Sequence, residues 1–265
     1  MPGFKTIAIS DPMFERDNLR YITVKSENIK GRGDISVFVP PGKSYKNLPI
    51  VLLLHGICGN HWAWTHLAGI HIQVMSGITH GLLRPMVLVM PSDGLWGADS
   101  GYMQYKDQDF EKWIMTDVVG AVTQAIKETS NDSVLFIAGL SAGGFGALRI
   151  GAKYGNRIKA VSGLSSMTDA SQLQDFSADD MTGLIHKNTG ESSVFETMVK
   201  NNNALPKIRF DCGRSDPLLE HNRTLHKQML EQKITHVYQE FGGRHDWPYC
   251  RKNIFKTLVF FSQQL

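Results

Sequence analysis

The chain has 265 residues, of which 42% are hydrophobic and 20% charged, and its formal net charge at pH 7 is +3. This length suits one domain with a large buried core, and the composition is that of an ordinary soluble globular protein. The near balance of 28 basic and 25 acidic residues, without a long run of Lys or Arg, argues against a nucleic-acid partner. No segment approaches the roughly 18 consecutive apolar residues of a membrane span.

The amino-terminal sequence and the cysteines are informative about the cellular location of the protein. Residues 1–11 lack the charged start and continuous apolar stretch of a secretory signal. Cys58, Cys212 and Cys250 are an odd number at no metal-binding spacing, so we expect reduced thiols and no metal site. We therefore expect a cytoplasmic protein, although a secreted form that has lost its signal would have the same sequence pattern.

Two apolar runs near the amino terminus predict a β-hairpin. Residues 19–24 and 35–39 have the composition of strands, and the segment 30–33 (Lys-Gly-Arg-Gly) between them has the composition of a turn. We expect this hairpin to add an antiparallel edge to a larger sheet.

The rest of the chain alternates short apolar runs with helical patterns. Apolar residues recur every four positions from 114 to 126, and similar stripes over 218–229 and 254–261 predict two more helices. Strands separated by helices form a mostly parallel sheet that is covered on both faces. We therefore predict an α/β fold with a twisted sheet of about eight strands. The six strands after the hairpin are expected at residues 50–54, 86–90, 134–138, 160–164, 208–211 and 237–241.

Residues 166–204 interrupt this alternation, because they are rich in Asp, Ser, Thr and Asn and have only weak periodicity. We interpret residues 1–265 as one domain in which this segment is an insertion over the carboxyl edge of the sheet, forming a partial lid. A long surface connection without a role in substrate binding would have the same composition.

The strand expected at 134–138 runs directly into residues 139–143 (Gly-Leu-Ser-Ala-Gly), and helix-forming residues follow. A Gly-x-Ser-x-Gly sequence at a strand-to-helix junction holds the serine in a tight, strained turn with its hydroxyl exposed. The helix that starts there directs its N–H groups at developing negative charge. A phosphate-binding loop is the alternative, but its lysine is missing. We predict Ser141 as a nucleophile and the backbone N–H of Ala142 as an oxyanion donor.

A second oxyanion donor is expected after the strand at 50–54. That strand leads into residues 55–60 (His-Gly-Ile-Cys-Gly-Asn), whose glycines let the backbone curl towards the serine. We predict the N–H of Ile57 as this donor, with that of Cys58 as the neighbouring alternative. His55 precedes the turn, and we interpret it as a packed or hydrogen-bonded structural histidine rather than a base.

The base and its acid partner should follow the serine, because α/β hydrolases have the chain order Ser, acid, His. His245 lies in a loop between the last expected strand and the closing helix, which suits a catalytic base. Asp216 follows the strand at 208–211 and can fix the imidazole tautomer. We favour it over Asp211, which ends that strand, and over Asp246, which is adjacent to His245 and would need an awkward backbone.

These segments together resemble the esterase D branch of the α/β hydrolases, which includes S-formylglutathione hydrolases, tributyrin-type esterases, feruloyl and acetyl-xylan esterases, and mycolyltransferases. The resemblance implies the α/β-hydrolase fold and hydrolysis of small acyl esters without a metal or organic cofactor. It also implies a triad of Ser141, Asp216 and His245, with Ile57 and Ala142 as oxyanion donors. The matching segments are residues 54–60 with Trp64, 139–148, 212–216 and 243–249.

Two departures from the branch limit what can be said of the substrate. The loop after His55 lacks the longer pattern with threonine and cysteine found in S-formylglutathione hydrolases, and the segment 166–204 matches no substrate class. Aromatic residues at the same end of the sheet are candidates for the pocket wall and suit sugar or phenolic esters. These candidates are Trp62, Trp64, Trp96, Tyr102 and Trp247.

The sequence thus predicts a serine carboxylesterase that acts on a small-molecule ester, without nucleic acid or membrane as a partner. A homo-oligomer is compatible with the sequence. Alternatives are an acyltransferase with the same triad, in which a bound alcohol outcompetes water, and a thioesterase like S-formylglutathione hydrolase. A binding module that kept the scaffold but lost its chemistry is disfavoured, because all three triad residue types are present.

Overall fold

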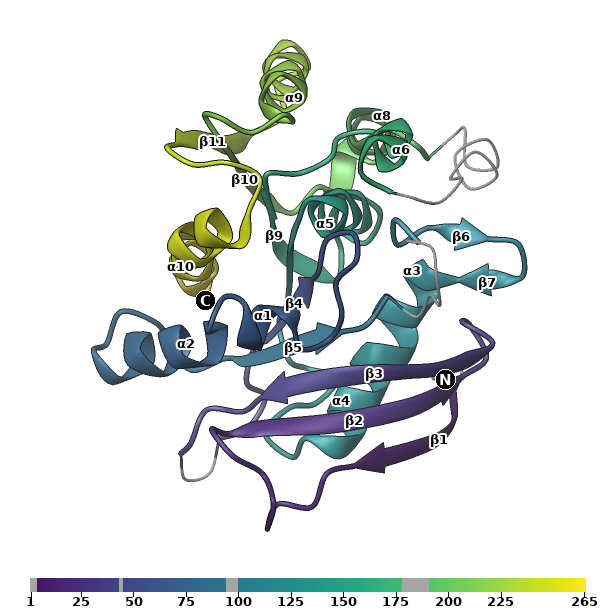
Figure 1. The fold of residues 1–265 in the computed structure, drawn as a ribbon, viewed down its shortest axis with the longest axis vertical. Helices are drawn as coiled ribbons and strands as arrows, with labels where there is room; N and C mark the ends of the chain where they lie inside the picture. The colour runs from purple at the N-terminus through teal and green to yellow at the C-terminus, as the bar shows by residue number, and fades with distance from the viewer. Residues whose placement is uncertain (1–3, 43–44, 94–99, 178–190) are drawn as a thin grey trace.

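The computed structural model describes residues 4–42, 45–93, 100–177 and 191–265, and Figure 1 shows a large twisted sheet with helices on both sides. The main sheet of the described residues has nine strands in the order β1-β2-β3-β5-β4-β8-β9-β10-β11. In this sheet, β5, β4, β8, β9, β10 and β11 pair in parallel, whereas β1, β2 and β3 pair antiparallel, as does β3 with β5. Their bounds are β1 (Phe4–Ile9), β2 (Leu19–Ser26), β3 (Gly31–Phe38), β4 (Ile50–Leu54), β5 (Val87–Pro91), β8 (Leu135–Leu140), β9 (Ile158–Leu164), β10 (Lys207–Gly213) and β11 (His236–Phe241).

The mostly parallel sheet and the antiparallel edge are confirmed, but β1 was not predicted from the sequence. Its residues have no strict alternation, and four of the six are exposed, because the strand pairs only with β2 at the edge of the sheet. A separate short hairpin joins β6 (Gln104–Tyr105) and β7 (Gln108–Asp109).

Helices cover both faces of the sheet, as predicted. The expected helix from 114 to 126 is divided, because a π-helical segment at Trp113–Val118 lies between α3 and α4. The helix α2 was not predicted, since Ile72 is 65% exposed on its solvent side and weakens the apolar periodicity. The bounds are α1 (Ala63–His66), α2 (Ile70–Thr79), α3 (Phe110–Lys112), α4 (Val119–Ala125), α5 (Ala142–Lys153), α6 (Leu173–Phe176), α8 (Val194–Lys200), α9 (Leu219–Glu231) and α10 (Trp247–Ser262).

The central strand β4 explains why the sheet is buried on both faces. All five of its residues are buried, and successive side chains point to opposite sides. Leu52 and Leu54 pack in the core beneath α3, α4, α5, α8 and α9, whereas Val51 and Leu53 pack in the core beneath α1, α2 and α10. Continuous apolar strands of this kind are typical of parallel sheets with two helical layers.

The described parts of the expected insertion are 166–177 and 191–204. The backbone N–H of Ala170 donates to the carbonyl of Ser192 at 2.8 Å, and that of Val194 donates to Thr168 at 3.0 Å. The two ends of the segment are therefore held together at its base. Residues 178–190 lie outside the described part of the chain. Among the helices that the structure describes, none is both long enough and apolar enough to cross a bilayer.

The parallel strands place four loops at one edge of the sheet. The carboxyl ends of β4, β8, β10 and β11 lead into the segments that begin at residues 55, 141, 214 and 242. In open α/β sheets, the crevice outside these carboxyl ends is where ligands bind.

Candidate active site

Ser141 occupies a strained turn between β8 and α5. Its φ is 56° and its ψ is −122°, a backbone conformation that L-residues rarely adopt. Its backbone is held on both sides, because its N–H donates to Leu164 at 3.0 Å and its carbonyl accepts from Met167 at 3.2 Å. The surrounding structure thus fixes the conformation that presents the hydroxyl.

The glycines on either side of Ser141 allow the backbone to pass close to its neighbours. A Cβ at Gly139 would lie 2.2 Å from the carbonyl oxygen of Gly143. A Cβ at Gly143 would lie 2.4 Å from the carbonyl oxygens of both Leu54 and His55. Because those contacts involve backbone atoms that cannot rotate away, only glycine fits at either position.

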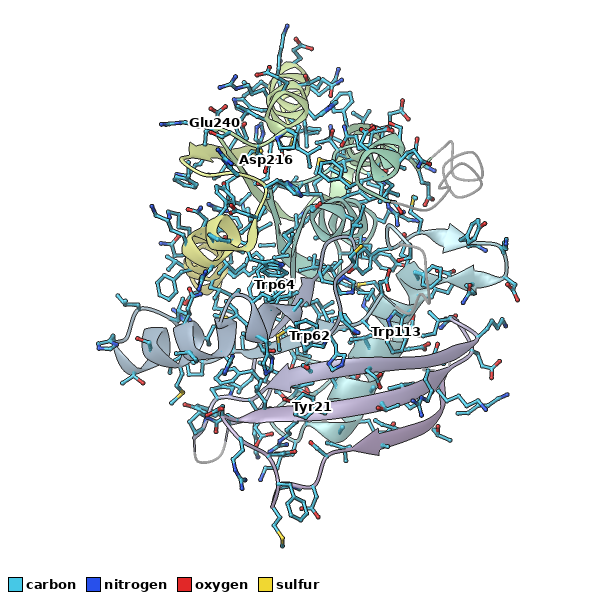
Figure 2. All side chains as sticks on the ribbon, in the orientation of Figure 1. Tyr21, Trp62, Trp64, Trp113, Asp216 and Glu240 are labelled. Atoms are coloured by element: carbon cyan, nitrogen blue, oxygen red, sulfur yellow. The ribbon has the colours of Figure 1, made fainter. Side chains whose placement is uncertain are left out.

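The structure brings Ser141, His245 and Asp216 into one hydrogen-bonded chain. The Oγ of Ser141 lies 2.9 Å from the Nε2 of His245, and the Nδ1 of His245 lies 2.9 Å and 3.1 Å from the two carboxylate oxygens of Asp216. An ionised carboxylate can only accept, so Nδ1 carries the imidazole proton and Nε2 is left to accept from the hydroxyl. Asp216 is labelled in Figure 2.

The loops that carry the acid and the base are joined to each other. The backbone N–H of Arg214 donates to Phe241 at 2.8 Å, and that of Ser215 donates to Gly243 at 3.0 Å. The carboxylate of Asp216 also accepts from the backbone N–H of Leu218 at 2.8 Å. These contacts position the carboxylate before any substrate arrives.

The environment of Asp216 favours its ionised form. Burial by itself would raise the pKa of this carboxyl group, but the interactions that favour the carboxylate, led by the hydrogen bond from His245 and including that from the backbone N–H of Leu218, together outweigh burial and hold the pKa below its ordinary value of 3.8. The carboxylate is therefore charged at neutral pH.

The other two candidate acids have partners elsewhere. Asp211 is fully buried and accepts from Arg209 and from the hydroxyl of Tyr249. Asp246 caps the start of α10, where its carboxylate accepts from the backbone N–H of Tyr249 at 2.9 Å. Neither carboxylate forms a hydrogen bond with the imidazole of His245.

His55 is a structural residue, in agreement with its interpretation from the sequence. It is 2% exposed, and its Nε2 accepts from the backbone N–H of Asp93 at 3.1 Å. The proton of the ring is therefore on Nδ1, which donates to the carbonyl of Gly56 at 2.8 Å. Gly59 donates its backbone N–H to the same carbonyl at 3.0 Å.

The position of that carbonyl orients the next peptide N–H. In a trans peptide the carbonyl and the following N–H point in opposite directions, so the N–H of Ile57 points away from His55. The loop also lies against the nucleophile, because a Cβ at Gly56 would be 3.1 Å from the Cβ of Ser141.

A cavity of about 250 Å³ opens beside Ser141 and His245. Ser141 and His245 line it together, and Ile57 and Trp247 contribute apolar walls. The further lining residues are Gly56, Cys58, Leu140, Ser165, Phe176, Asp246 and Cys250.

A family model described as "Putative esterase" matches residues 26–261. The chain belongs to the esterase family. This esterase is also 27% identical over 236 residues to an acetyl esterase from Caldicellulosiruptor saccharolyticus, and the match covers 82% of this chain and 85% of that relative. The family and this relative support serine carboxylesterase activity.

Solved structures show that this esterase has the α/β-hydrolase fold. An S-formylglutathione hydrolase from Staphylococcus aureus superposes with a TM-score of 0.79 at 19% identity, covering 97% of this chain and 100% of the other. A ferulic acid esterase superposes with a TM-score of 0.80 at 20% identity, covering 99% and 100%.

The prediction that Trp64 and Tyr102 line the pocket of this esterase is wrong, because both are buried beneath it. Trp64 is 0% exposed, and its indole N–H donates to the carbonyl of Leu54 at 3.1 Å. The hydroxyl of Tyr102 donates to the carbonyl of His55 at 2.9 Å. Both side chains hold the backbone from which the 55–60 loop begins.

The remaining aromatic candidates differ in position. Trp247 lines the cavity and meets the ring of Trp64 edge-on, with ring centroids 5.3 Å apart. Trp62 is 44% exposed and is not part of the cavity lining, and Figure 2 labels it beside Trp64. Trp96 lies outside the described residues.

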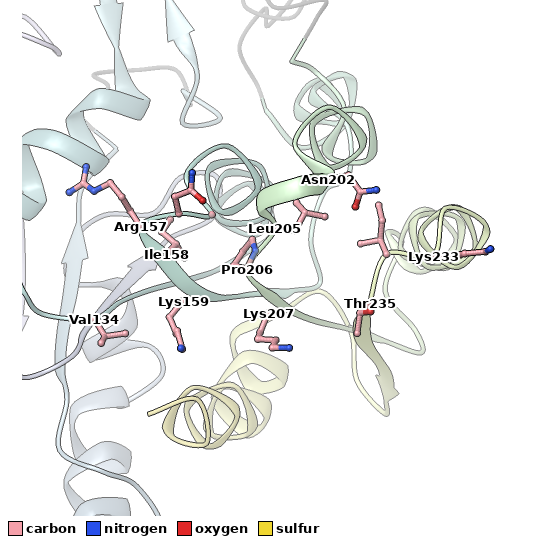
Figure 3. A pocket seen from close by; sticks show the side chains of 13 residues that line it. Val134, Arg157, Ile158, Lys159, Asn202, Leu205, Pro206, Lys207, Lys233 and Thr235 are labelled. Carbon is pink, nitrogen blue, oxygen red and sulfur yellow. The ribbon is translucent and has the colours of Figure 1, made fainter.

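A larger cavity, of about 560 Å³, lies at the other end of the strands of this esterase. Lys159, Lys207 and Thr235, near the amino ends of β9, β10 and β11, are among its lining residues (Figure 3). It contains neither Ser141 nor His245, so the smaller cavity is the candidate active site.

Several cavity residues were not predicted from the sequence. Leu140 and Asp246 could have been found, because they are adjacent in the chain to Ser141 and His245. Phe176 could not, because it comes from the segment 166–204, whose sequence has no regular pattern. Among the described residues, no three His, Cys, Asp or Glu side chains gather as a group that could hold a metal ion.

Proposed function

We propose that this esterase hydrolyses small acyl esters through an acyl-enzyme on Ser141, with His245 as general base and acid and Asp216 as its orienting carboxylate. One observation carries the proposal. The Oγ of Ser141, both ring nitrogens of His245 and the carboxylate of Asp216 form one chain of hydrogen bonds of 2.9 to 3.1 Å.

In the first half of the reaction, the Oγ of Ser141 attacks the ester carbonyl carbon while its proton passes to the Nε2 of His245. The carbonyl oxygen becomes an oxyanion. When this intermediate collapses, the bond to the alcohol oxygen breaks, and the proton on Nε2 moves to the leaving alcohol. The acyl group stays on Ser141 as an ester.

In the second half, water attacks the acyl-enzyme and gives one proton to the Nε2 of His245. Collapse of the second intermediate returns that proton to Oγ and releases the carboxylic acid. His245 suits both steps, because its side chain is 19% exposed and water can reach it, whereas that of Asp216 is 0% exposed.

We assign the oxyanion site to the backbone N–H groups of Ile57 and Ala142. Ala142 is the first residue of α5, and the first N–H groups of a helix have no acceptor within it. The N–H of Ile57 is oriented by the hydrogen bonds that hold the Gly56 carbonyl. Each such donor contributes about 3–4 kcal/mol to stabilising the transition state.

The size of the cavity supports a small substrate. Its volume of about 250 Å³ is below the about 300–1,000 Å³ of pockets that enclose drug-sized ligands. We therefore propose a short acyl group. No contact among the described residues favours acyl transfer or thioester hydrolysis over this reaction.

The test is the variant Ser141→Ala, assayed with 4-nitrophenyl acetate and butyrate. We expect loss of at least about 10³-fold in kcat, because the attacking atom is removed while the fold is kept. A fluorophosphonate probe followed by mass spectrometry should label Ser141 in the wild type only. Wild-type turnover by the variant, or labelling of another residue, would refute the proposal.

A further inference from the structure

The ring of Phe176 lies against the imidazole of His245. Their ring centroids are 5.0 Å apart and their planes are tilted by 39°. Phe176 is half-buried and lines the same cavity as Ser141, so it is accessible to a bound substrate. It is the last residue of α6 and comes from the segment 166–204 that the sequence predicts as an insertion.

The ring is held in place by the elements around it. Leu173, one turn earlier in α6, is 0% exposed in the core. The segment before α6 is tied to the nucleophile itself, because Met167 donates its backbone N–H to the carbonyl of Ser141 at 3.2 Å. The segment is closed at its base by the bridge between Asp169 and Ser193. Phe176 itself packs against the same core and forms a wall of the cavity.

The chemistry of the site decides which part of an ester lies at this wall. The leaving alcohol oxygen must come within hydrogen-bond reach of the Nε2 of His245, from which it takes its proton. The carbonyl oxygen must instead lie at the N–H groups of Ile57 and Ala142. A ring that covers the imidazole therefore borders the alcohol part of the substrate.

We propose that Phe176 determines specificity for the alcohol part and selects esters whose alcohol is a flat aromatic ring, that is, aryl esters. This inference rests on the proposed function. An aromatic alcohol can meet the ring of Phe176 in an offset or edge-on contact, which a saturated ring cannot reproduce. Phe176 is thus a specificity-determining residue, and the described part of the 166–204 segment contributes to substrate recognition through it.

The experiment compares phenyl acetate with cyclohexyl acetate, which have rings of similar size but different shape. For Phe176→Ala we expect kcat/KM for phenyl acetate to fall about 2- to 10-fold relative to the wild type, the range expected for loss of an aromatic pair. For cyclohexyl acetate the change should stay within about 2-fold. Comparing variant with wild type for each ester cancels the intrinsic reactivity of the two leaving groups.

Two controls separate alcohol recognition from other effects. Phe195→Ala removes the same type of side chain from the same segment, but Phe195 lines a different cavity. This variant should therefore keep the wild-type kcat/KM for both phenyl acetate and cyclohexyl acetate. The ratio of phenyl acetate to phenyl butyrate should be unaffected by Phe176→Ala, because the acyl part lies elsewhere. Phe176→Leu keeps most of the apolar volume and should still lose the preference for the phenyl ring.

An equal loss for both acetates, or a change confined to the acyl preference, would overturn this inference. Equal losses accompanied by a shifted pH profile would mean that Phe176 acts only through the imidazole. The proposed function fails by a different result, which is retained turnover in Ser141→Ala, so the two failures are distinguishable.

Discussion

His55 holds the carbonyl of Gly56 with an Nδ1–H donor at 2.8 Å, and this contact turns the next peptide N–H, that of Ile57, to the opposite side. The histidine is 2% exposed, and its Nδ1 contacts a backbone carbonyl of the loop that lines the cavity. Its ring is fixed in turn by the backbone N–H of Asp93. A side chain outside the proposed triad thus positions one of the two proposed oxyanion donors.

We therefore expect His55→Ala to lower kcat by about 10- to 100-fold with little change in KM. Complete loss of one oxyanion donor lowers kcat by about 10²- to 10³-fold, and this variant would only misplace the donor. The measurement is steady-state kinetics with 4-nitrophenyl acetate, beside urea unfolding to confirm that the variant is folded. His221→Ala, an exposed histidine on α9, is the control and should retain wild-type kcat. An unchanged kcat in a folded His55→Ala would exclude a positioning role.

Replacing Asp216 by Asn should lower kcat by about 10³- to 10⁴-fold, because an amide can present its N–H to Nδ1 and favour the wrong imidazole tautomer. The two carboxylate contacts at 2.9 and 3.1 Å are the structural basis for this expectation. Asp132→Asn, at an exposed position, serves as the matched control. If the rate of Asp216→Asn stayed within about tenfold of wild type, another carboxylate would have to orient His245.

The ionisation of Asp216 should also appear in stability. Its pKa in the folded protein is held below the ordinary value of 3.8 by His245, against the effect of burial. The ionised carboxylate therefore contributes its full stabilisation of the folded protein at pH values above the unfolded-state pKa of 3.8. This contribution is lost as the pH falls through the lower pKa of the folded state. Urea unfolding between about pH 6 and pH 3 should show wild type losing more free energy of unfolding than Asp216→Asn. Parallel curves for the two proteins would contradict this.

Gly143→Ala should destabilise the protein by at least about 1–3 kcal/mol, because its new Cβ would lie 2.4 Å from two carbonyl oxygens of the neighbouring strand end. The strand end and the nucleophile turn cannot both keep their positions, so activity should fall with stability. Thermal unfolding provides the measurement. Gly31→Ala is the control, since a Cβ there meets only one backbone oxygen at 3.6 Å. Equal effects of the two substitutions would argue against the close approach.

We expect the two tryptophans that meet edge-on to have different roles, Trp247 in binding substrate and Trp64 in packing. Trp247→Phe changes a wall of the cavity and should raise KM for 4-nitrophenyl acetate. Trp64→Phe removes the donor to Leu54 and should lower the free energy of unfolding by about 1 kcal/mol while leaving KM within about 2-fold. Kinetics and urea unfolding on both variants provide the measurements. A higher KM in Trp64→Phe alone would reverse the assignment.

Much of the fold could be predicted from local pattern. Each buried strand, such as β4 or β8, is a continuous apolar run, because a strand in a parallel sheet packs on both faces. The sequence of β1 has no such apolar run, because this strand is held by its hydrogen bonds to β2 at the edge of the sheet and most of its residues are exposed. The π-helical segment at Trp113–Val118 could not be predicted either, since the same apolar residues are compatible with a regular α-helix.

The candidate site also contains residues that the sequence could predict and residues that it could not. Its central residues could be proposed from sequence because steric crowding at Ser141 demands glycines nearby in the chain, and because the carboxyl ends of parallel strands bring successive loops to one edge. Which aromatic rings line the cavity could not be proposed in this way. Trp64 and Trp247 lie in contact, yet only the second lines the cavity.

The sequence by itself determined the sheet, the turn at Ser141 and the chain order of the candidate catalytic residues, because each depends on short-range sterics or on the period of apolar residues. Only the tertiary structure decided that His55 orients the loop, that Trp64 and Tyr102 are buried beneath it, and that Phe176 covers the imidazole. These roles depend on contacts between segments far apart in the chain. No local pattern of residues encodes them.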